Sequence, residues 1–355
     1  MSPRTPPEPA PDVPGRAAGP ASCCAPPGGK RALDASADPA GTGVAPLPDP
    51  GPRAGSDDGL VALAGGAFWM GSEDPDGFAS DGEGPVREVT LAPFLIEATA
   101  VTNAAFTAFI SDTGYVTEAQ RFGWSYVFRG HLSQKFARGL RAVPGVPWWV
   151  AVPGARWDRP LGERSSLSGL ADHPVVHVSW HDAAAYAAWA GRTLPTEAQW
   201  EFAARGGTDR QTFPWGDRLE PRGRHRCNVF QGRFPEHDTA ADGFAGTCPV
   251  DAFTPNAYGL HNMVGNVWEW TADWFSPVWH AEDRPETRVD PVGPRGGPGH
   301  DTVPLDTTGQ RRRVQKGGSF LCHRSYCNRY RLGARTANVP DSSTTNAGFR
   351  CVRSG

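Results

Sequence analysis

The segment GGSFLCHRSYCNRYR, residues 317–331, sets Cys322 and Cys327 five positions apart among arginines, aromatic residues and a histidine. Five residues along an α-helix rotate the second side chain by roughly 140° from the first. Five residues along a strand put it on the opposite face of the sheet. Because neither regular element makes the two thiols converge, we expect a loop or a bend to bring them together.

Two converging thiols in this segment could carry redox or metal chemistry. The positive charge of Arg324, Arg329 and Arg331 favours the thiolate form, which is the form that binds a soft metal such as Cu(I) or cycles through a disulfide. The spacing alone equally allows two half-buried structural cysteines, because C-x4-C is not a recognised zinc motif. Both interpretations stay open at the level of spacing.

Composition narrows the class of protein. The 355 residues carry a formal net charge of only -3, which offers no footprint for nucleic acid or an acidic membrane surface. We see no run of about 20 apolar residues and no apolar signal-peptide core near the N-terminus, so we expect a cytoplasmic location. The seven cysteines are an odd number, and in a reducing compartment they argue against a disulfide framework.

The chain divides near residue 58. Residues 1–58 are rich in Pro, Ala and Gly and are expected to be disordered, whereas residues 59–355 are expected to form one domain. Short apolar or alternating runs at 87–99 and 175–180 are typical of strands. Helices are predicted over 102–113 and 181–190, and a short one from Thr196. The pattern predicts a compact, loop-rich α+β domain with little regular secondary structure.

Several further motifs accompany the cysteine segment along this domain. They are GGAFWMGS at 65–72, TGYVTEAQRFGWSYVF at 113–128, RTLPTEAQWE at 192–201, GNVWEW at 265–270 and DSSTTNAGFRCV at 341–352. From about residue 60 onward the chain resembles the formylglycine-generating enzymes, the sulfatase-modifying oxidases. RTLPTEAQWE and GNVWEW occur across a wider superfamily with non-oxidase members, whereas CHRSYC at 322–327 is the specific element.

The resemblance implies a fold related to C-type lectins and an enzyme that acts on another protein. Such an enzyme oxidises the cysteine of a Cys-x-Pro-x-Arg sequence in an unfolded sulfatase to Cα-formylglycine and thereby activates the sulfatase. It consumes O2, uses Cu(I) held by Cys322 and Cys327, and needs a thiol or another reductant. We expect it to be a monomer.

Further site residues follow from the same resemblance. It implies that Trp268 lines an oxygen pocket, that Ser319 donates a hydrogen bond to oxygen or to the substrate thiol, and that Tyr326 belongs to the catalytic site. It implies substrate-binding roles for Arg335, Ser343 and Asn346. A core tryptophan and a serine that bonds its own turn are the structural alternatives. His323 is expected to make a structural hydrogen bond, because neighbours in an extended segment point to opposite sides.

Two structural Ca²⁺ sites are implied as well. The first would use Asn228, Val229, Asp242 and Phe244, and the second Asn262, Gly265, Val267 and Glu269. Side-chain and carbonyl oxygens are the hard ligands that Ca²⁺ accepts. From the residues alone the signal is weak, because Asn and Asp in turns usually bond their own backbone.

The remaining cysteines fit a cytoplasmic member of this family. Ala187, Ala204 and Leu332 stand where the secreted relatives have disulfide cysteines, which leaves Cys351 without its partner, and Cys227 and Cys248 are expected to be free thiols.

Two other functions remain open from the sequence. An iron-dependent sulfoxide synthase of the same superfamily would need a His-rich iron site, and the chain has no His-x3-His-x-Glu motif. A lectin-like calcium-binding module would have no use for Cys322 and Cys327.

Overall fold

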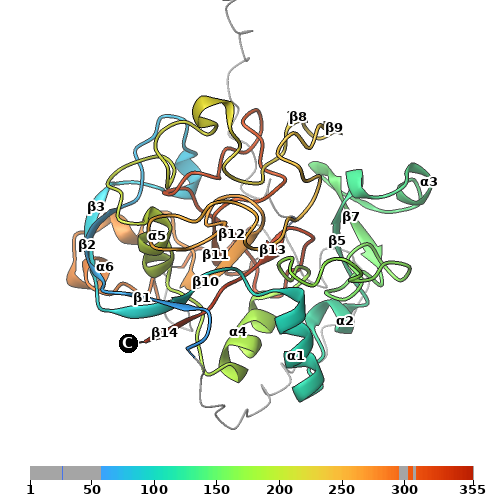
Figure 1. The fold of residues 1–355 in the computed structure, drawn as a ribbon, viewed down its shortest axis with the longest axis horizontal. Coiled ribbons are helices and arrows are strands. Elements are labelled where there is room, and N and C mark those ends of the chain that lie inside the picture. Colours follow the sequence, from blue (N-terminus) through green and yellow to red (C-terminus); the bar gives the residue numbers. More distant parts are fainter. Residues whose placement is uncertain (1–25, 27–56, 296–302, 307–308, 355) are drawn as a thin grey trace, which may run out of the picture.

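The computed structural model describes Pro26 and residues 57–295, 303–306 and 309–354 (Figure 1). The disorder predicted for residues 1–58 therefore lies, except at Pro26, Asp57 and Asp58, outside the described residues. Pro26 is buried, and its carbonyl oxygen accepts a hydrogen bond of 3.2 Å from Asn338 Nδ2. None of the helices in the described part of the chain is long and apolar enough to cross a bilayer.

Short strands and helices alternate with long loops, as expected for a loop-rich α+β domain (Figure 1). The strands are β1 Leu60–Leu63, β2 Gly66–Met70, β3 Arg87–Leu91, β4 Phe94–Glu97, β5 Trp124–Phe128, β6 Ala142–Val143, β7 Val146–Pro153, β8 Gly232–Arg233, β9 His237–Asp238, β10 Trp268–Trp274, β11 Arg313–Lys316, β12 Thr336–Asn338, β13 Ala347–Gly348 and β14 Val352–Ser354. The helices are α1 Asn103–Thr113, α2 Glu118–Phe122, α3 Gln134–Ala137, α4 Trp180–Trp189, α5 Glu197–Arg205 and α6 Pro285–Arg288.

The three predicted helices are present, and local capping explains where they begin. Thr102, Ser179 and Thr196 each accept a hydrogen bond from a backbone amide in the first turn, ahead of α1, α4 and α5. α4 begins at Trp180, one residue before the predicted start. α2, α3 and α6 were not predicted, because four or five residues are too few to show a helical period.

A four-stranded sheet of order β12-β11-β10-β13 lies at the centre of the molecule (Figure 1). β13 runs parallel to β10, while β11 runs antiparallel to both β10 and β12. The predicted run at 87–99 forms β3 and β4. The prediction of a strand at 175–180 is wrong, because His177 has a left-handed φ of 58° and its amide donates to Thr344 O, far along the chain.

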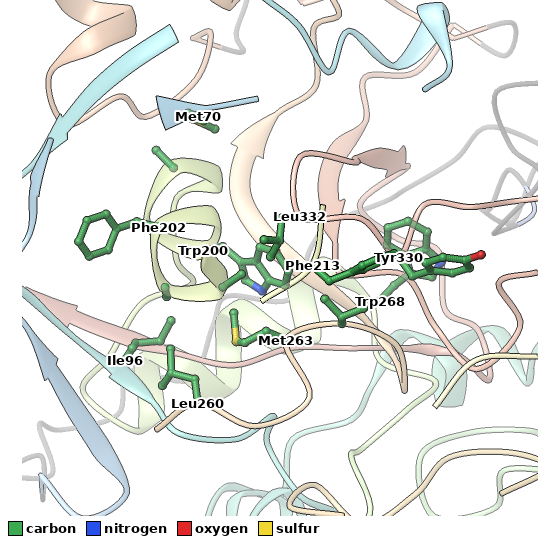
Figure 2. Packing of buried hydrophobic residues seen from close by; sticks show 14 of the residues in the cluster. Met70, Ile96, Trp200, Phe202, Phe213, Leu260, Met263, Trp268, Tyr330 and Leu332 are labelled. Carbon is green, nitrogen blue, oxygen red and sulfur yellow. The ribbon is translucent and has the colours of Figure 1, made fainter. Parts of the chain in front are cut away.

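The largest core cluster joins α5, β10 and the cysteine segment. Figure 2 shows Ile96, Trp200, Leu260 and Met263 among its side chains. Cys322, Cys327 and Trp268 belong to the same buried cluster, so the core itself holds the thiols in place. Burying a large apolar side chain contributes roughly 1.5–3 kcal/mol, so this cluster stabilises the surroundings of both thiols.

Buried ion pairs tie the short elements and the loops between them together. Lys316 Nζ binds Glu201 Oε2 at 2.9 Å, and Arg331 binds both carboxylate oxygens of Glu83 at 2.7 Å. All four side chains are at least nine-tenths buried. Removing one partner of such a pair costs roughly 3–5 kcal/mol because a buried charge is left behind.

Candidate active site

A tight turn brings Cys322 and Cys327 together, as the spacing predicts. The segment lies between β11 and β12, where Cys322 N donates to Ser319 O at 2.9 Å and Cys327 N donates to His323 O at 2.7 Å. The two Sγ atoms are 3.6 Å apart and each residue is only 1% exposed. A disulfide bond is about 2.05 Å long, so the pair is reduced.

A small pocket of about 10 Å³ opens on the two thiols. That volume is about what one water-sized molecule needs. Its walls are mostly aromatic, with Tyr326 stacked on Phe234 at a centroid distance of 4.9 Å and edge-on to Trp148 at 4.7 Å. The lining residues are Trp148, Trp149, Phe234, Ser319, Leu321, Cys322, Tyr326 and Cys327.

Two residues predicted separately, Ser319 and Asn346, meet at the pocket. Asn346 Nδ2 donates to Ser319 Oγ at 2.9 Å, and Leu321 N donates to the same oxygen at 3.3 Å. The amide of Ser319 points at Cys322 Sγ, 3.4 Å away. Because the hydroxyl oxygen already accepts two hydrogen bonds, the hydroxyl proton can be donated to a molecule in the pocket.

Of the three arginines predicted to act on the thiols, Arg329 is the one whose guanidinium is within contact distance of sulfur. Its Nη1 is 3.7 Å from Cys327 Sγ, and its other nitrogens bind Asp81. Burial raises the pKa of Asp81, and the bond to Arg329 opposes that rise. Arg331 is bound to Glu83, and Arg324 lines a separate cleft.

Trp268 and Tyr326 differ in their relation to the pocket. Tyr326 lines it, whereas Trp268 is fully buried in the adjoining core and is not among the lining residues. Trp268 N donates to Asn346 O at 2.8 Å, and its indole nitrogen has no hydrogen-bond partner among the described residues. The role of Trp268 in an oxygen pocket stays a prediction.

The structure places Arg335 away from the thiols. Arg335 Nη2 binds Glu197 Oε2 at 2.7 Å and Nη1 binds Ser276 O at 2.9 Å, and the residue lines a different pocket. It is 4% exposed, so the geometry gives it a structural ion pair and does not support direct contact with a substrate. Ser343, by contrast, lies in the loop that leads to Asn346, and its Oγ is 2.8 Å from Ser125 Oγ.

His323 makes the local hydrogen bond that the sequence predicts. Its Nδ1 is 2.7 Å from Ser325 Oγ, and its ring packs edge-on against Phe230. The side chain lines the larger cleft, of about 770 Å³, and not the thiol pocket. The described residues contain no group of three or more His, Cys, Asp or Glu placed to hold a metal ion.

The residues predicted for the first calcium site do gather in space. Asp242 accepts hydrogen bonds from Val229 N and Phe244 N at 3.1 and 3.0 Å. Asn228 Oδ1 is buried and has no hydrogen-bond partner among the described residues. A buried oxygen without a donor is what a hard cation would satisfy, so Asn228 is available to Ca²⁺, whereas each oxygen of Asp242 already accepts a backbone hydrogen bond.

The second predicted set fits less completely. Asn262 Oδ1 is also buried without a hydrogen-bond partner in the described part of the chain, and Gly265 turns the chain with a φ of 77°. Glu269, however, accepts hydrogen bonds from Arg350 to both carboxylate oxygens and from Trp200 Nε1 at 2.7 Å. Its carboxylate therefore already has structural partners.

Calcium is expected to raise the melting temperature, and Asn228→Ala is expected to reduce that response. A ligand that binds only the folded state at a hundred times its Kd stabilises by about 2.7 kcal/mol. Thermal unfolding with added Ca²⁺ or chelator measures the effect. Asn256→Ala is the matched control, because Asn256 makes four hydrogen bonds outside both predicted sets. If neither Ca²⁺ nor the chelator changes the melting temperature of the wild-type protein, the first site is ruled out.

The other cysteines in the described part of the chain are buried away from the pocket. Cys227, Cys248 and Cys351 are thiols that are at most 2% exposed. Burial is the main cause that raises the pKa of Cys248 to about 12 and the pKa of Cys227 higher still. They are therefore neutral and poorly reactive near pH 7.

Sequence reasoning missed the supports that surround the pocket. Trp148 and Phe234 come from segments with no chemical motif, and Asp81 precedes its partner Arg329 by 248 positions. The paired Trp148 and Trp149 were the one visible signal, because adjacent large aromatics in a short strand need a buried or binding surface.

Known proteins with similar sequences share the whole domain. The chain is 59% identical over 294 residues to the formylglycine-generating enzyme of Thermomonospora curvata, covering 83% of this chain and 93% of that protein. It is 52% identical to the Streptomyces coelicolor enzyme of the same name, over 86% of this chain and 92% of that one. A mouse protein named inactive C-alpha-formylglycine-generating enzyme 2 is 44% identical, over 84% of this chain and 86% of that protein.

The fold is also found among solved structures. PvdO from Pseudomonas aeruginosa matches with a TM-score of 0.55 and 23% identity, over 83% of this chain and 94% of that one. A family model described as the sulfatase-modifying factor enzyme 1-like domain matches residues 44–355. With the reduced thiol pair of CHRSYC set in this fold, the chain belongs to the formylglycine-generating, sulfatase-modifying enzyme family.

Proposed function

We propose that this chain oxidises the cysteine of a Cys-x-Pro-x-Arg sequence in an unfolded sulfatase to Cα-formylglycine, with O2 as the electron acceptor. The observation that carries the proposal is the pair of buried thiols, 3.6 Å apart, on a pocket of molecular size. Family membership alone would not suffice, because a relative of 44% identity is named inactive. The pocket chemistry is what supports activity here.

The two sulfurs fit Cu(I) as the cofactor. Thiolates are soft ligands, and Cys322 and Cys327 are close enough for one ion to touch both. When bound, Cu(I) would supply the one-electron chemistry that O2 needs in order to react. Burial of both residues to 1% exposure keeps bulk water from the site, and Arg329 offsets negative charge at Cys327.

The electron balance explains the need for a reductant. Converting the substrate CH2–SH to an aldehyde with release of H2S takes one water and yields two electrons and two protons. Full reduction of O2 to water takes four of each. Two further electrons and two protons must therefore come from outside, and a thiol is a suitable donor. Ser319, with its hydroxyl proton available, is placed to donate a hydrogen bond to a molecule in the pocket.

The substrate would reach the thiols as an extended chain. The sulfatase must be unfolded so that its cysteine can enter a pocket this narrow. Tyr326 and Trp148 form an aromatic wall against which the peptide can pack, and Ser343 and Asn346 lie on the loop that borders Ser319. A monomer in the cytoplasm is part of this proposal, and the free thiols of the buried cysteines fit the reducing conditions of that compartment.

Mass spectrometry of a synthetic Cys-x-Pro-x-Arg peptide tests the proposed reaction. Incubation with the Cu(I)-loaded protein, O2 and a thiol is expected to lower the peptide mass by about 18 Da, because a thiol and a hydrogen give way to a carbonyl oxygen. Peptides with serine in place of the cysteine, or alanine in place of the proline and the arginine, serve as controls. An unchanged cysteine peptide under all copper and reductant conditions would refute the proposal.

A further inference from the structure

We propose that His177 and Ser125 are positioning residues that set the geometry of the thiol pocket through hydrogen bonds to the loop at 343–346. The effect of these residues on catalysis rests on the proposed function, whereas their effect on the geometry of the pocket does not. Neither residue touches the pocket. Hydrogen bonds join His177 to Ser125 and Ser125 to Ser343. The backbone continues from Ser343 to Thr344, and further hydrogen bonds join Thr344, Asn346, Ser319 and Cys322 in that order.

This series of connected residues begins with a buried histidine in an unusual conformation. His177 is fully buried and has a φ of 58°, a left-handed conformation that is uncommon outside glycine. Burial is the main cause that lowers its pKa to about 3, so the ring is neutral. Its Nδ1 is 2.8 Å from Ser125 Oγ, and its amide donates to Thr344 O at 2.9 Å. The tautomer with the proton on Nδ1 donates to Ser125 Oγ and leaves the single Ser125 proton for Ser343 O.

Ser125 then joins the histidine to the loop that follows β12. Its Oγ is 2.9 Å from Ser343 O and 2.8 Å from Ser343 Oγ. The backbone beside it adds two more bonds, from Tyr126 N to Ser343 O at 3.3 Å and from Thr345 N to Tyr126 O at 3.0 Å. Residues 343–345 are thereby fixed against β5 and the His177 turn.

The fixed loop sets the direction of the Asn346 side chain. Thr344 Oγ1 donates to Asn346 Oδ1 at 2.8 Å, which leaves the amide nitrogen facing Ser319 Oγ at 2.9 Å. Reversing the amide would require both hydroxyls to exchange donor and acceptor roles, and the Ser319 proton would then be taken up by Asn346. Ser319, held in this way, points its own amide at Cys322 Sγ. Each of these side chains is at least 95% buried, so solvent cannot replace a broken bond.

His177 and Ser125 therefore lie at one end of a series of connected residues, and the other end of the series contacts Cys322 Sγ. A strained, fully buried histidine persists only where its surroundings hold it, and such outliers gather at functional sites. Loss of either side chain should loosen residues 343–346 and misplace the Ser319 hydroxyl. A misplacement of about 1 Å at reacting groups can cost up to a hundredfold in rate.

Ser125→Ala and His177→Gln test the proposal in the full-length protein. Each is expected to lower kcat/KM for the Cys-x-Pro-x-Arg peptide by roughly tenfold at temperatures well below the melting transition. The matched controls are Thr271→Val, which removes a fully buried hydroxyl bonded to Val314 O, and His280→Gln, which removes a buried histidine bonded to Gly84 O. The controls are expected to stay within about twofold of wild type, although they lose comparable stability.

Two readouts without turnover separate this proposal from the proposed function. Ser125→Ala and His177→Gln should speed amide hydrogen exchange at 343–346 and change the alkylation rate of Cys322, and the control variants should leave both near wild type. These results would support the positioning role even if wild type makes no formylglycine. If the variants and their controls lose activity in equal proportion, or if exchange and alkylation stay at wild-type values, the positioning role is overturned.

Discussion

Replacing Cys322 or Cys327 with serine is expected to lower formylglycine formation by roughly a thousandfold or more, as removal of a central catalytic group does in other enzymes. An alcohol is a poor ligand for Cu(I) and cannot take part in thiol redox chemistry. The fold should survive, because serine has nearly the shape of cysteine and a polar group already lies beside each sulfur, Ser319 N at Cys322 and Arg329 Nη1 at Cys327. Peptide mass spectrometry measures the activity, and competition with a Cu(I) chelator measures the metal.

Cys248→Ser is the matched control for the cysteine variants. Cys248 is fully buried, and its neighbour Asn262 approaches the sulfur at 3.9 Å, so the substitution is of the same kind but outside the pocket. Its activity and copper content should equal those of wild type. Normal turnover by Cys322→Ser would exclude Cu(I) binding by the two thiolates as the basis of activity. An equal loss of activity in Cys248→Ser would mean that the cysteine substitutions act by lowering stability.

Local chemistry explains which parts of the molecule could be predicted from the sequence. The capping residues Thr102, Ser179 and Thr196 lie next to the amides they bind, so the helix starts follow from neighbouring residues. The convergence of Cys322 and Cys327 also follows from a short spacing that excludes both regular elements. Such features depend on contacts within a few positions of the chain.

The parts that could not be predicted depend on contacts across the fold. The run at 175–180 has the alternating pattern of a strand, yet bonds to Val101 and Thr344 turn it away from that geometry. Arg335 has the charge of a substrate-binding residue, but Glu197, 138 positions earlier, binds it in the interior. Neither partner can be found from the local pattern, because nothing near the residue in sequence specifies which distant group it will meet.

The same limit applies to the ligand residues of the predicted calcium sites. Asn228 and Asn262 read as ordinary turn residues, and only the fold shows that their side-chain oxygens are buried without a hydrogen-bond partner among the described residues. For Glu269 the fold gives the opposite result, because Arg350 binds both of its oxygens. The resemblance to the family identified these residues, and their surroundings in the structure distinguish which of them are available as ligands.

Removing the charge of Arg329 is expected to slow the reactions of Cys327 by about tenfold or more, because a cation within about 4–6 Å stabilises a thiolate by that order. Arg329 is fully buried, 3.7 Å from the sulfur, and packs on the Phe78 ring at 3.9 Å. The single variant Arg329→Gln would leave the buried Asp81 carboxylate without its ionic partner and lower the free energy of unfolding by roughly 3–5 kcal/mol. The double variant Arg329→Gln/Asp81→Asn removes both charges and avoids that loss.

The neighbouring pair supplies the control for this variant. Arg331→Gln/Glu83→Gln removes a similarly buried ion pair from the same two segments. The partners of Arg331 are Glu83, Asn328 O and the Asp74 carboxylate at 3.8 Å instead of sulfur. Alkylation of Cys327 and formylglycine formation should fall in the first double variant and stay near wild type in the second. The lost rate should return as the pH rises, since more thiolate then forms without help. Asp81→Asn alone retains the cation and should react at least as fast as wild type. If both double variants slow equally, or if raising the pH restores nothing, Arg329 acts through stability and not through charge at Cys327.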